Sequence, residues 1–375
     1  MVAVPKDEER GPPWVPGEEE KERVRGTVEE LVARLSDALS AFRPRIVPVG
    51  STAKDTFLPG DSDIDIYVVV EDPEGALEVA RSLFPEGRKK PGALRIWNFR
   101  FRGFDVDLVF VRPDDPKVDT MRHTLFFREH LTEEARNEVR RAKAFFKSRG
   151  LYGAEIGGIT GVALEELVRR YGTLEEICGL FLEKNPQEIW LQDPVLERPR
   201  NLLASINEAK AKRIVEACRE FLETGTFEYK RYTEEDFRAE HAGWHFLECE
   251  RRRDRAADYS IALSACTKAC NELRAREPEI RCECEAFVGK DKIVVAFDVE
   301  PEKLPPTRKV CIPKKYERAI RRFLEAHPDV AETYERDGYF CARVPRSFTE
   351  PVPVVKKRLL ERMRKEGYTC TPGRP

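Results

Sequence analysis

A Gly50-Ser51 pair is followed, twelve residues later, by the acidic motif Asp63-Ile64-Asp65. Because side chains alternate between the two faces of a strand, both aspartates of this motif point to the same face. A third carboxylate, Asp107, lies in a second apolar run, 104–110, and joins the first two if the two strands are neighbours. Magnesium prefers oxygen ligands and is commonly shared between carboxylates and substrate phosphates. The pattern therefore predicts magnesium-dependent nucleotidyl transfer.

Three such acids can hold two ions, one that lowers the pKa of an attacking hydroxyl and one that stabilises charge on the leaving pyrophosphate. Gly50 lets the backbone approach a phosphate closely, and Ser51 adds a hydroxyl and a backbone donor. An acid pair on a strand is, by itself, also typical of an exposed edge or turn. Together with the Gly-Ser turn and the later acidic strand, however, it matches the signature of the polymerase-β-like nucleotidyltransferase superfamily.

Further segments narrow this resemblance, which extends from Val47 to about Ala204. The chain resembles the class I, archaeal type of CCA-adding tRNA nucleotidyltransferase, which builds the 3′ CCA end of tRNA without a nucleic-acid template. The segments that carry the resemblance are Val49 to Gly60, Lys143 to Lys147, Gly150 to Glu155, Gly158 to Gly161, Asp193 to Val195 and Arg200 to Ala204.

The resemblance implies that Asp63 and Asp65 bind both magnesium ions and that Asp107 binds the ion that activates the primer 3′-hydroxyl. The first acid is commonly Glu in the family, so Asp63 is a departure that keeps the charge. The residues implied to contact the incoming nucleotide are Gly50, Ser51, Lys54, His123, Lys143, Tyr152 and Thr160. Arg200 matches the arginine that helps to read the Watson–Crick edge of C or A, and Asn201 is its neighbour.

Three of these residues also admit purely structural roles. Lys143 can be a solvated residue of a helix that the sequence predicts over 132–149, with acidic residues at its start and Gly150 beyond its end. His123 can be an ordinary turn or surface histidine, and Tyr152 can simply pack against the helix end.

The predicted fold class is α+β, with a polymerase-β-like palm followed by a helical domain and a C-terminal α+β RNA-binding domain. We expect an N-terminal helix and palm over 1–131, a helical nucleotide-recognition domain over 132–225 and an RNA-binding body with a shortened tail over 226–375. The expected palm elements are a helix at 18–42 and strands at 46–49, 64–70, 94–101 and 104–110. A hairpin is expected around Gly289-Lys290-Asp291.

The hydrophobic content of 41% suffices for folded cores, and no apolar run approaches the roughly 18 residues of a membrane span. We expect no membrane partner and a cytoplasmic location. The 36% of charged residues is typical of proteins from hot environments. Residues 301–375 contain 18 Lys or Arg and 10 Asp or Glu, a net charge of +8 within a chain of net charge −2. They form the predicted RNA-facing surface, although a solvated charged face explains the same pattern.

Ten cysteines in an intracellular chain indicate reduced, mostly buried thiols. Cys266, Cys270, Cys282 and Cys284 have helical and strand spacings that would let both pairs face one zinc ion, but the spacing is not that of a common zinc finger. Core packing is the default interpretation, and zinc stays open.

The predicted function is addition of C and A from CTP and ATP to the 3′ end of tRNA or a tRNA-like RNA, with two Mg²⁺ ions and release of pyrophosphate. An alternative keeps the chemistry but uses ATP on a different acceptor, as an oligoadenylate-synthetase-like or poly(A)-like enzyme. A non-catalytic RNA-binding module is a third possibility, which the three intact aspartates disfavour. The oligomeric state is open, with a homodimer among the alternatives.

Overall fold

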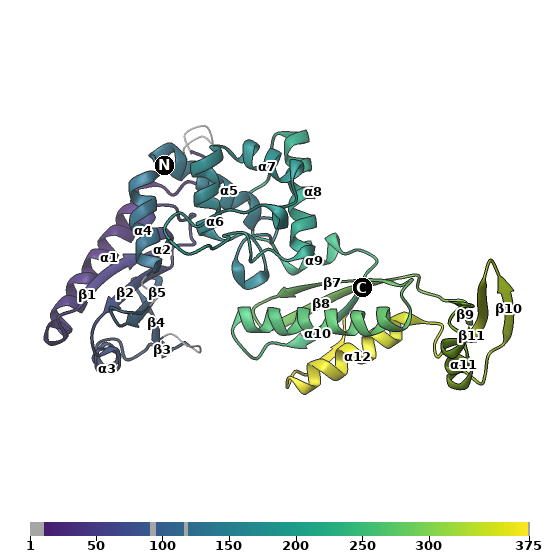
Figure 1. Ribbon diagram of the computed structural model, residues 1–375. Coiled ribbons are helices and arrows are strands. Elements are labelled where there is room, and N and C mark those ends of the chain that lie inside the picture. The colour runs from purple at the N-terminus through teal and green to yellow at the C-terminus, as the bar shows by residue number, and fades with distance from the viewer. Residues whose placement is uncertain (1–10, 91–94, 116–118, 374–375) are drawn as a thin grey trace, which may run out of the picture. The chain divides into compact units, whose positions relative to one another are not determined.

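The computed structural model describes residues 11–90, 95–115 and 119–373, and the chain divides into two compact units. Unit 1 is Met1–Tyr232 and unit 2 is Thr233–Pro375 (Figure 1). Both units combine helices with sheets, as expected for an α+β protein. The expected domain limits at residues 131 and 225 stay predictions.

Unit 1 contains a five-stranded sheet in the order β1-β2-β5-β4-β3, in which β2 and β5 are parallel and the other neighbours are antiparallel. The strands are β1 (Arg45–Val49), β2 (Ile64–Val69), β3 (Arg88–Lys89), β4 (Arg95–Phe101) and β5 (Phe104–Val111). Four of them confirm the predicted strands; residue 94, the predicted start of one, lies outside the described residues.

Two helices, α1 (Glu18–Ala38) and α3 (Pro73–Leu83), cover one face of this sheet. Leu31 and Leu35 of α1 are fully buried there, which contributes roughly 1.5–3 kcal/mol for each side chain. The predicted first helix is confirmed up to Ala38, after which a short 3₁₀ helix follows. The helix α4 (Asp119–His130) packs on the opposite face through Met121.

The rest of unit 1 is helical and has its own core, which includes Phe145, Phe146, Phe181 and Phe221. Its main helices are α5 (Glu133–Lys147), α6 (Gly161–Tyr171), α7 (Leu174–Glu183) and α8 (Glu208–Thr224). The predicted helix over 132–149 is confirmed as α5. It begins because the Thr132 hydroxyl accepts the Ala135 N–H at 3.2 Å.

Unit 2 contains two antiparallel sheets (Figure 1). A four-stranded sheet, β12-β6-β8-β7, packs against α10, which also contacts α12. The segment between β8 and α12 forms a second sheet, β10-β11-β9, with the helix α11. The elements are α9 (Glu234–Glu240), β6 (His245–Glu250), α10 (Arg255–Arg276), β7 (Arg281–Val288), β8 (Lys292–Glu300), β9 (Thr307–Pro313), α11 (Glu317–Ala326), β10 (Glu332–Arg336), β11 (Tyr339–Pro345), α12 (Pro351–Lys365) and β12 (Cys370–Pro372). The predicted hairpin is confirmed, with Val288 paired to Ile293.

The cysteines correct the expectation of reduced thiols. Eight of the ten form disulfides, all in unit 2, whereas Cys178 and Cys218 of unit 1 are free and buried. The disulfides join Cys249 to Cys370, Cys266 to Cys284, Cys270 to Cys282 and Cys311 to Cys341. The expectation failed because the partners are brought together by strand register and by the packing of α10 on β7, which spacing along the chain does not reveal.

Each helix in the described part of the chain is too short or too polar to cross a membrane.

Candidate active site

The predicted carboxylates meet on one face of the unit 1 sheet. Asp65 of β2 and Asp107 of β5 are direct partners in the register of the parallel pair, and Asp63 comes immediately before β2. Alternate residues of the same strands, including Ile64, Ile66 and Val106, are fully buried against the other face. The alternation of the strands therefore places the three acids on the face opposite α1 and α3, as predicted.

The carboxylates destabilise one another's charged forms. Burial, reinforced by the negative charges of Asp107 and Asp63, raises the pKa of Asp65 to about 7. Burial also raises the pKa of Asp63, with Asp61 and Asp105 as the next causes. Asp107 accepts hydrogen bonds from Lys90 Nζ and, at 2.9 Å, from Asn98 Nδ2. A cluster of oxygen donors with excess negative charge is the environment that a hard divalent cation stabilises.

Gly50 lies next to these carboxylates, directly after β1. Val49, the last residue of β1, pairs with Asp65, and α2 (Gly50–Lys54) begins at the next residue. Gly50 has φ +78°, and a Cβ at this position would lie 2.4 Å from Asp65 Oδ2. Only glycine therefore satisfies both the backbone conformation and the close approach of the carboxylate.

A second group of predicted residues gathers at the start of α6. The Thr160 hydroxyl caps the helix by accepting the Ala163 N–H at 3.2 Å. A Cβ on Gly161 would lie 3.0 Å from the Tyr152 hydroxyl and 3.9 Å from Lys143 Nζ, so both polar groups face the first residue of α6. A helix N-terminus favours anions, and an adjacent lysine strengthens that preference.

A buried ion-pair network connects α6 to α2 and to Thr56 through Glu165, which is fully buried. Lys54 Nζ donates to Glu165 Oε2 at 2.6 Å, and the Thr56 hydroxyl donates to Glu165 Oε1 at 3.0 Å. Lys143 Nζ donates to the Thr56 carbonyl at 2.8 Å and lies 3.6 Å from Glu165 Oε1. Two lysines thus share one glutamate, which leaves a net charge of +1.

The pKa values reflect this arrangement. Burial lowers the pKa of Lys143 to about 8, against the opposing attraction of Glu165. Burial acts to raise the pKa of Glu165, but the combined attraction of Lys54 and Lys143 outweighs burial. The pKa of Glu165 is therefore lower than its ordinary value. Lys143 is only 3% exposed, which excludes the alternative of a solvated helix residue.

His123 belongs to a third group, with Asp193 and Arg200. His123 Nε2 lies 2.8 and 2.9 Å from the two carboxylate oxygens of Asp193, and Arg200 donates to the same carboxylate at 3.4 Å. His123 is buried in α4, which excludes an ordinary turn or surface histidine, whereas the Arg200 side chain is 52% exposed. The predicted residues from two distant segments therefore meet.

Asn201 holds the backbone next to Arg200. Its Oδ1 accepts the N–H groups of Leu191 and Leu203 at 3.0 and 3.1 Å, and its Nδ2 donates to the Ile189 carbonyl at 3.1 Å. These bonds give the side chain a structural role, and a contact between Asn201 and a nucleotide stays a prediction.

Known proteins match the segments that carry this site. The nucleotidyltransferase domain family matches residues 28–143, which include Gly50, Ser51 and the three carboxylates. The CCA-adding enzyme of Pyrobaculum neutrophilum is 29% identical over 247 residues, which cover 57% of this chain and 59% of that protein. A CCA-adding enzyme sequence from Thermoplasma acidophilum is 31% identical over 185 residues, which cover 44% of this chain and 82% of that sequence. The chain belongs to the CCA-adding enzyme family.

This family member spans 59% of the length of its Pyrobaculum relatives. Among solved structures, that of E. coli MS115-1 CdnC with ATP covers 61% of this chain and 89% of that chain, with 18% sequence identity and a TM-score of 0.45. Nucleotidyltransferases use divalent metals, and the three carboxylates of this chain supply a suitable oxygen donor set.

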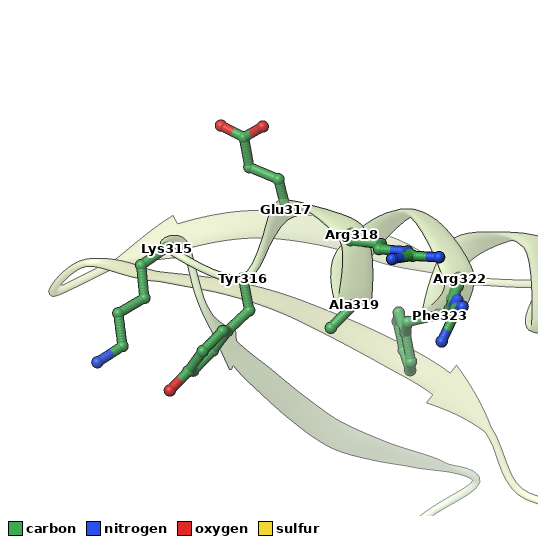
Figure 2. Close-up of a pocket in the computed structure, with 7 residues that line it drawn as sticks. All are labelled: Lys315, Tyr316, Glu317, Arg318, Ala319, Arg322 and Phe323. Carbon is green, nitrogen blue, oxygen red and sulfur yellow. The ribbon is translucent and has the colours of Figure 1, made fainter.

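Unit 2 of this chain carries a basic pocket of about 700 Å³ at the start of α11. Its lining residues are Lys315, Tyr316, Glu317, Arg318, Ala319, Arg322 and Phe323. Figure 2 shows Glu317 pointing away from the side on which Tyr316, Ala319 and Phe323 lie. Tyr316 is 53% exposed, and Lys315 Nζ lies 5.2 Å from the centroid of its ring. The pocket lies in the segment whose net positive charge predicted an RNA-facing surface.

Sequence reasoning missed three residues of the unit 1 site. Glu165 and Thr56 form the network between the two lysines, and Lys90 is the charge partner of Asp107. Glu165 stands next to Glu166, between the apolar residues Leu164 and Leu167, and this pattern does not show which of the two glutamates has a buried partner in another element.

Proposed function

We propose that the protein is a template-independent nucleotidyltransferase that adds C and A residues from CTP and ATP to the 3′ end of tRNA or a tRNA-like RNA. The observation that carries the proposal is the alignment of Asp65 with Asp107 beside Gly50, within a chain of the CCA-adding enzyme family. A palm with three carboxylates supports transfer chemistry, whereas a simple RNA-binding module would not require them.

Asp63, Asp65 and Asp107 would hold the metal, for which we propose two Mg²⁺ ions. When bound, the ions lower the pKa of the attacking 3′-hydroxyl and stabilise charge on the leaving pyrophosphate. Asn98 and Lys90 keep the Asp107 carboxylate in place by hydrogen bonds to its two oxygens. Gly50 has no Cβ and so leaves room for the Asp65 carboxylate next to the start of α2.

The N-terminus of α6 is the proposed binding site for the triphosphate. Lys143, Tyr152 and Thr160 surround this helix end, and Ser51 lies in α2, whose last residue, Lys54, belongs to the Glu165 network. Glu165 compensates one of the two charges of Lys54 and Lys143 and leaves one positive charge uncompensated, which favours an anionic ligand. A charged lysine and a phenolic hydroxyl are suitable donors to phosphate oxygens.

Arg200 is the proposed reader of the incoming base, because guanidinium donors suit the acceptors of C and A. The Asp193 carboxylate holds both His123 and Arg200, and Asn201 fixes the adjacent backbone. His123 therefore links α4 to Arg200 through Asp193. In this role His123 does not need to contact the base itself.

The α11 pocket is the proposed contact for RNA outside the catalytic unit. Lys315, Arg318 and Arg322 offer cations for phosphates, and the exposed Tyr316 ring offers a surface on which a base can stack. We further propose that the enzyme acts in the cytoplasm.

The decisive experiment supplies Mg²⁺ and a tRNA that ends at the discriminator base, with CTP and ATP singly and together, and sequences the 3′ ends. Addition of C, C and A supports the proposal. Addition from ATP alone, or products that form without RNA, would mean that the enzyme uses a different acceptor with the same nucleotidyl-transfer chemistry. Absence of any incorporation, with nucleotide binding intact, would exclude the enzyme assignment.

A further inference from the structure

Four cysteine sulfurs converge between α10 and β7 in unit 2. Cys266 and Cys270 are one helical turn apart on α10, and Cys282 and Cys284 are two residues apart on β7, so each pair lies on one face of its element. Cys266, Cys270 and Cys282 are at most 1% exposed, and Cys284 is partly buried. In this structure they form the disulfides Cys266–Cys284 and Cys270–Cys282.

Sulfurs of different disulfides are also close together. Cys270 Sγ lies 3.5 Å from Cys284 Sγ, and the sulfurs of Cys266, Cys270 and Cys284 all lie within 4.8 Å of one another. A tetrahedral zinc site with Zn–S bonds of about 2.3 Å has sulfurs roughly 3.8 Å apart. The fold therefore brings three of the four sulfurs to about the spacing of a thiolate metal site, and the disulfide to Cys270 holds the fourth, of Cys282, next to them.

The two disulfides restrict nearly the same segment of the unfolded chain. Cys270–Cys282 closes a loop with a sequence separation of 12 that lies inside the loop closed by Cys266–Cys284, with a separation of 18. Once the outer bond restricts the unfolded chain, the inner bond restricts it little further. A metal site, in contrast, requires all four thiolates.

A positive charge lies beside one of these cysteines. Arg274 follows Cys270 by one turn on the same face of α10, and its guanidinium donates to the Cys282 carbonyl. Four thiolates and one Zn²⁺ have a net charge of −2, which an adjacent cation partly compensates.

We propose that Cys266, Cys270, Cys282 and Cys284 form a zinc site when unit 2 is reduced, and that oxidation replaces the metal by the two disulfides. Reduction of both disulfides takes four electrons and four protons from two molecules of a dithiol, each of which leaves as a cyclic disulfide. Zn²⁺ then displaces the four thiol protons and forms four Zn–S bonds. In the reverse process two molecules of a disulfide oxidant, each reduced to its thiols, take up the four electrons, and the ion is released.

The test uses the full chain. Protein reduced anaerobically with dithiothreitol is incubated with excess Zn²⁺, separated from unbound metal by gel filtration and analysed for zinc by plasma emission spectrometry. We expect about one zinc ion per reduced chain and none in the oxidised chain. Co²⁺ in place of zinc should give the visible absorption of a tetrahedral thiolate complex.

Two double variants provide the comparison. Cys266→Ser with Cys270→Ser removes two proposed ligands and should abolish binding, whereas Cys249→Ser with Cys370→Ser removes a disulfide of the same unit and should retain it. If the first variant fails to fold, Cys284→Ser alone should weaken zinc affinity at least about tenfold. The proposal is overturned if reduced wild-type protein with native circular dichroism binds no zinc, or if the tetrad variants retain it.

Discussion

Gly50 shows how one backbone position can limit the geometry of the whole carboxylate cluster. Its positive φ starts α2 directly after β1, and its missing Cβ leaves space for the Asp65 carboxylate. The paired register of Val49 with Asp65 and of Asp65 with Asp107 then aligns three strands at this point. A change at Gly50 thus displaces the proposed catalytic acids without altering any of them.

Gly50→Ala should therefore affect catalysis more than stability. The added Cβ meets Asp65 Oδ2 and displaces the carboxylate, which should lower nucleotide incorporation at least about 100-fold. Gly60→Ala is the matched control, because Gly60 has φ +69° but no atom within 4 Å of an added Cβ. Both variants should lose about 1–2 kcal/mol in urea unfolding, as expected for a left-handed alanine. Equal activities of the two variants would contradict the role assigned to Gly50.

Asp107→Asn tests the charge of the acid cluster while keeping its shape. We expect incorporation to fall at least about 100-fold, because one metal-binding charge is lost, and RNA affinity to stay within about twofold. Asp37→Asn removes an exposed carboxylate of α1 in the same unit and should be neutral. Primer extension and filter binding provide the two measurements, and a parallel loss of RNA binding would point to misfolding instead.

Charged groups as well as apolar packing hold α6 to the neighbouring helices of unit 1. Glu165 joins α6 to Lys54 of α2 and, through Thr56, to Lys143 of α5. Its neighbour Glu166 is equally buried but pairs with Arg169 and Arg170 of the same helix, whose side chains are about a third exposed. One glutamate thus connects elements, whereas the other stabilises a single helix.

Glu165→Gln should lower the free energy of unfolding by roughly 3–5 kcal/mol, because it leaves two buried lysines without their counter-charge. Glu166→Gln should cost less, about 1 kcal/mol, since its arginines reach solvent. Urea denaturation measures both. Glu165→Gln should also raise the KM for the nucleotide relative to Glu166→Gln, because it misplaces Lys54 and Lys143. Similar losses in both variants would show that the network adds nothing beyond burial of a glutamate.

The parts of the site that sequence predicted are those with local signals. Alternating acids within an apolar strand and a glycine before them identify Asp63, Asp65 and Gly50 without any tertiary information. Glu165 was missed because its partner Lys54 lies 111 residues away, and only packing brings them together. The disulfides were missed for the same reason, since Cys249 and Cys370 meet through the pairing of β6 with β12.

For the whole molecule, charge is divided along the chain. The net charge of +8 in residues 301–375 contrasts with −10 in the rest, although the proposed substrates of the palm are polyanionic nucleotides. A local +1 at the Glu165 network suits a single triphosphate, whereas the many cations of unit 2 suit an extended phosphate backbone. Substrate chemistry and RNA affinity should therefore be separable by mutation.

Arg318→Ala with Arg322→Ala tests this separation at the α11 pocket. If both arginines contact RNA phosphates, the affinity for RNA should fall and the slope of log affinity against log salt should decrease by about 2. The KM for ATP with saturating RNA should stay unchanged, because the pocket lies in unit 2 and the proposed triphosphate site in unit 1.

The charge-matched control is Arg336→Ala with Arg343→Ala, in the strands next to α11. These arginines form ion pairs with Asp337 and Glu332 at 3.2 and 3.1 Å, so their charge is already compensated by the protein. We expect the control to keep the wild-type salt slope in filter-binding titrations over a range of salt concentrations. An equal loss of RNA affinity in both double variants would mean that binding depends on the overall charge of unit 2. The α11 pocket would then have no specific role in RNA binding.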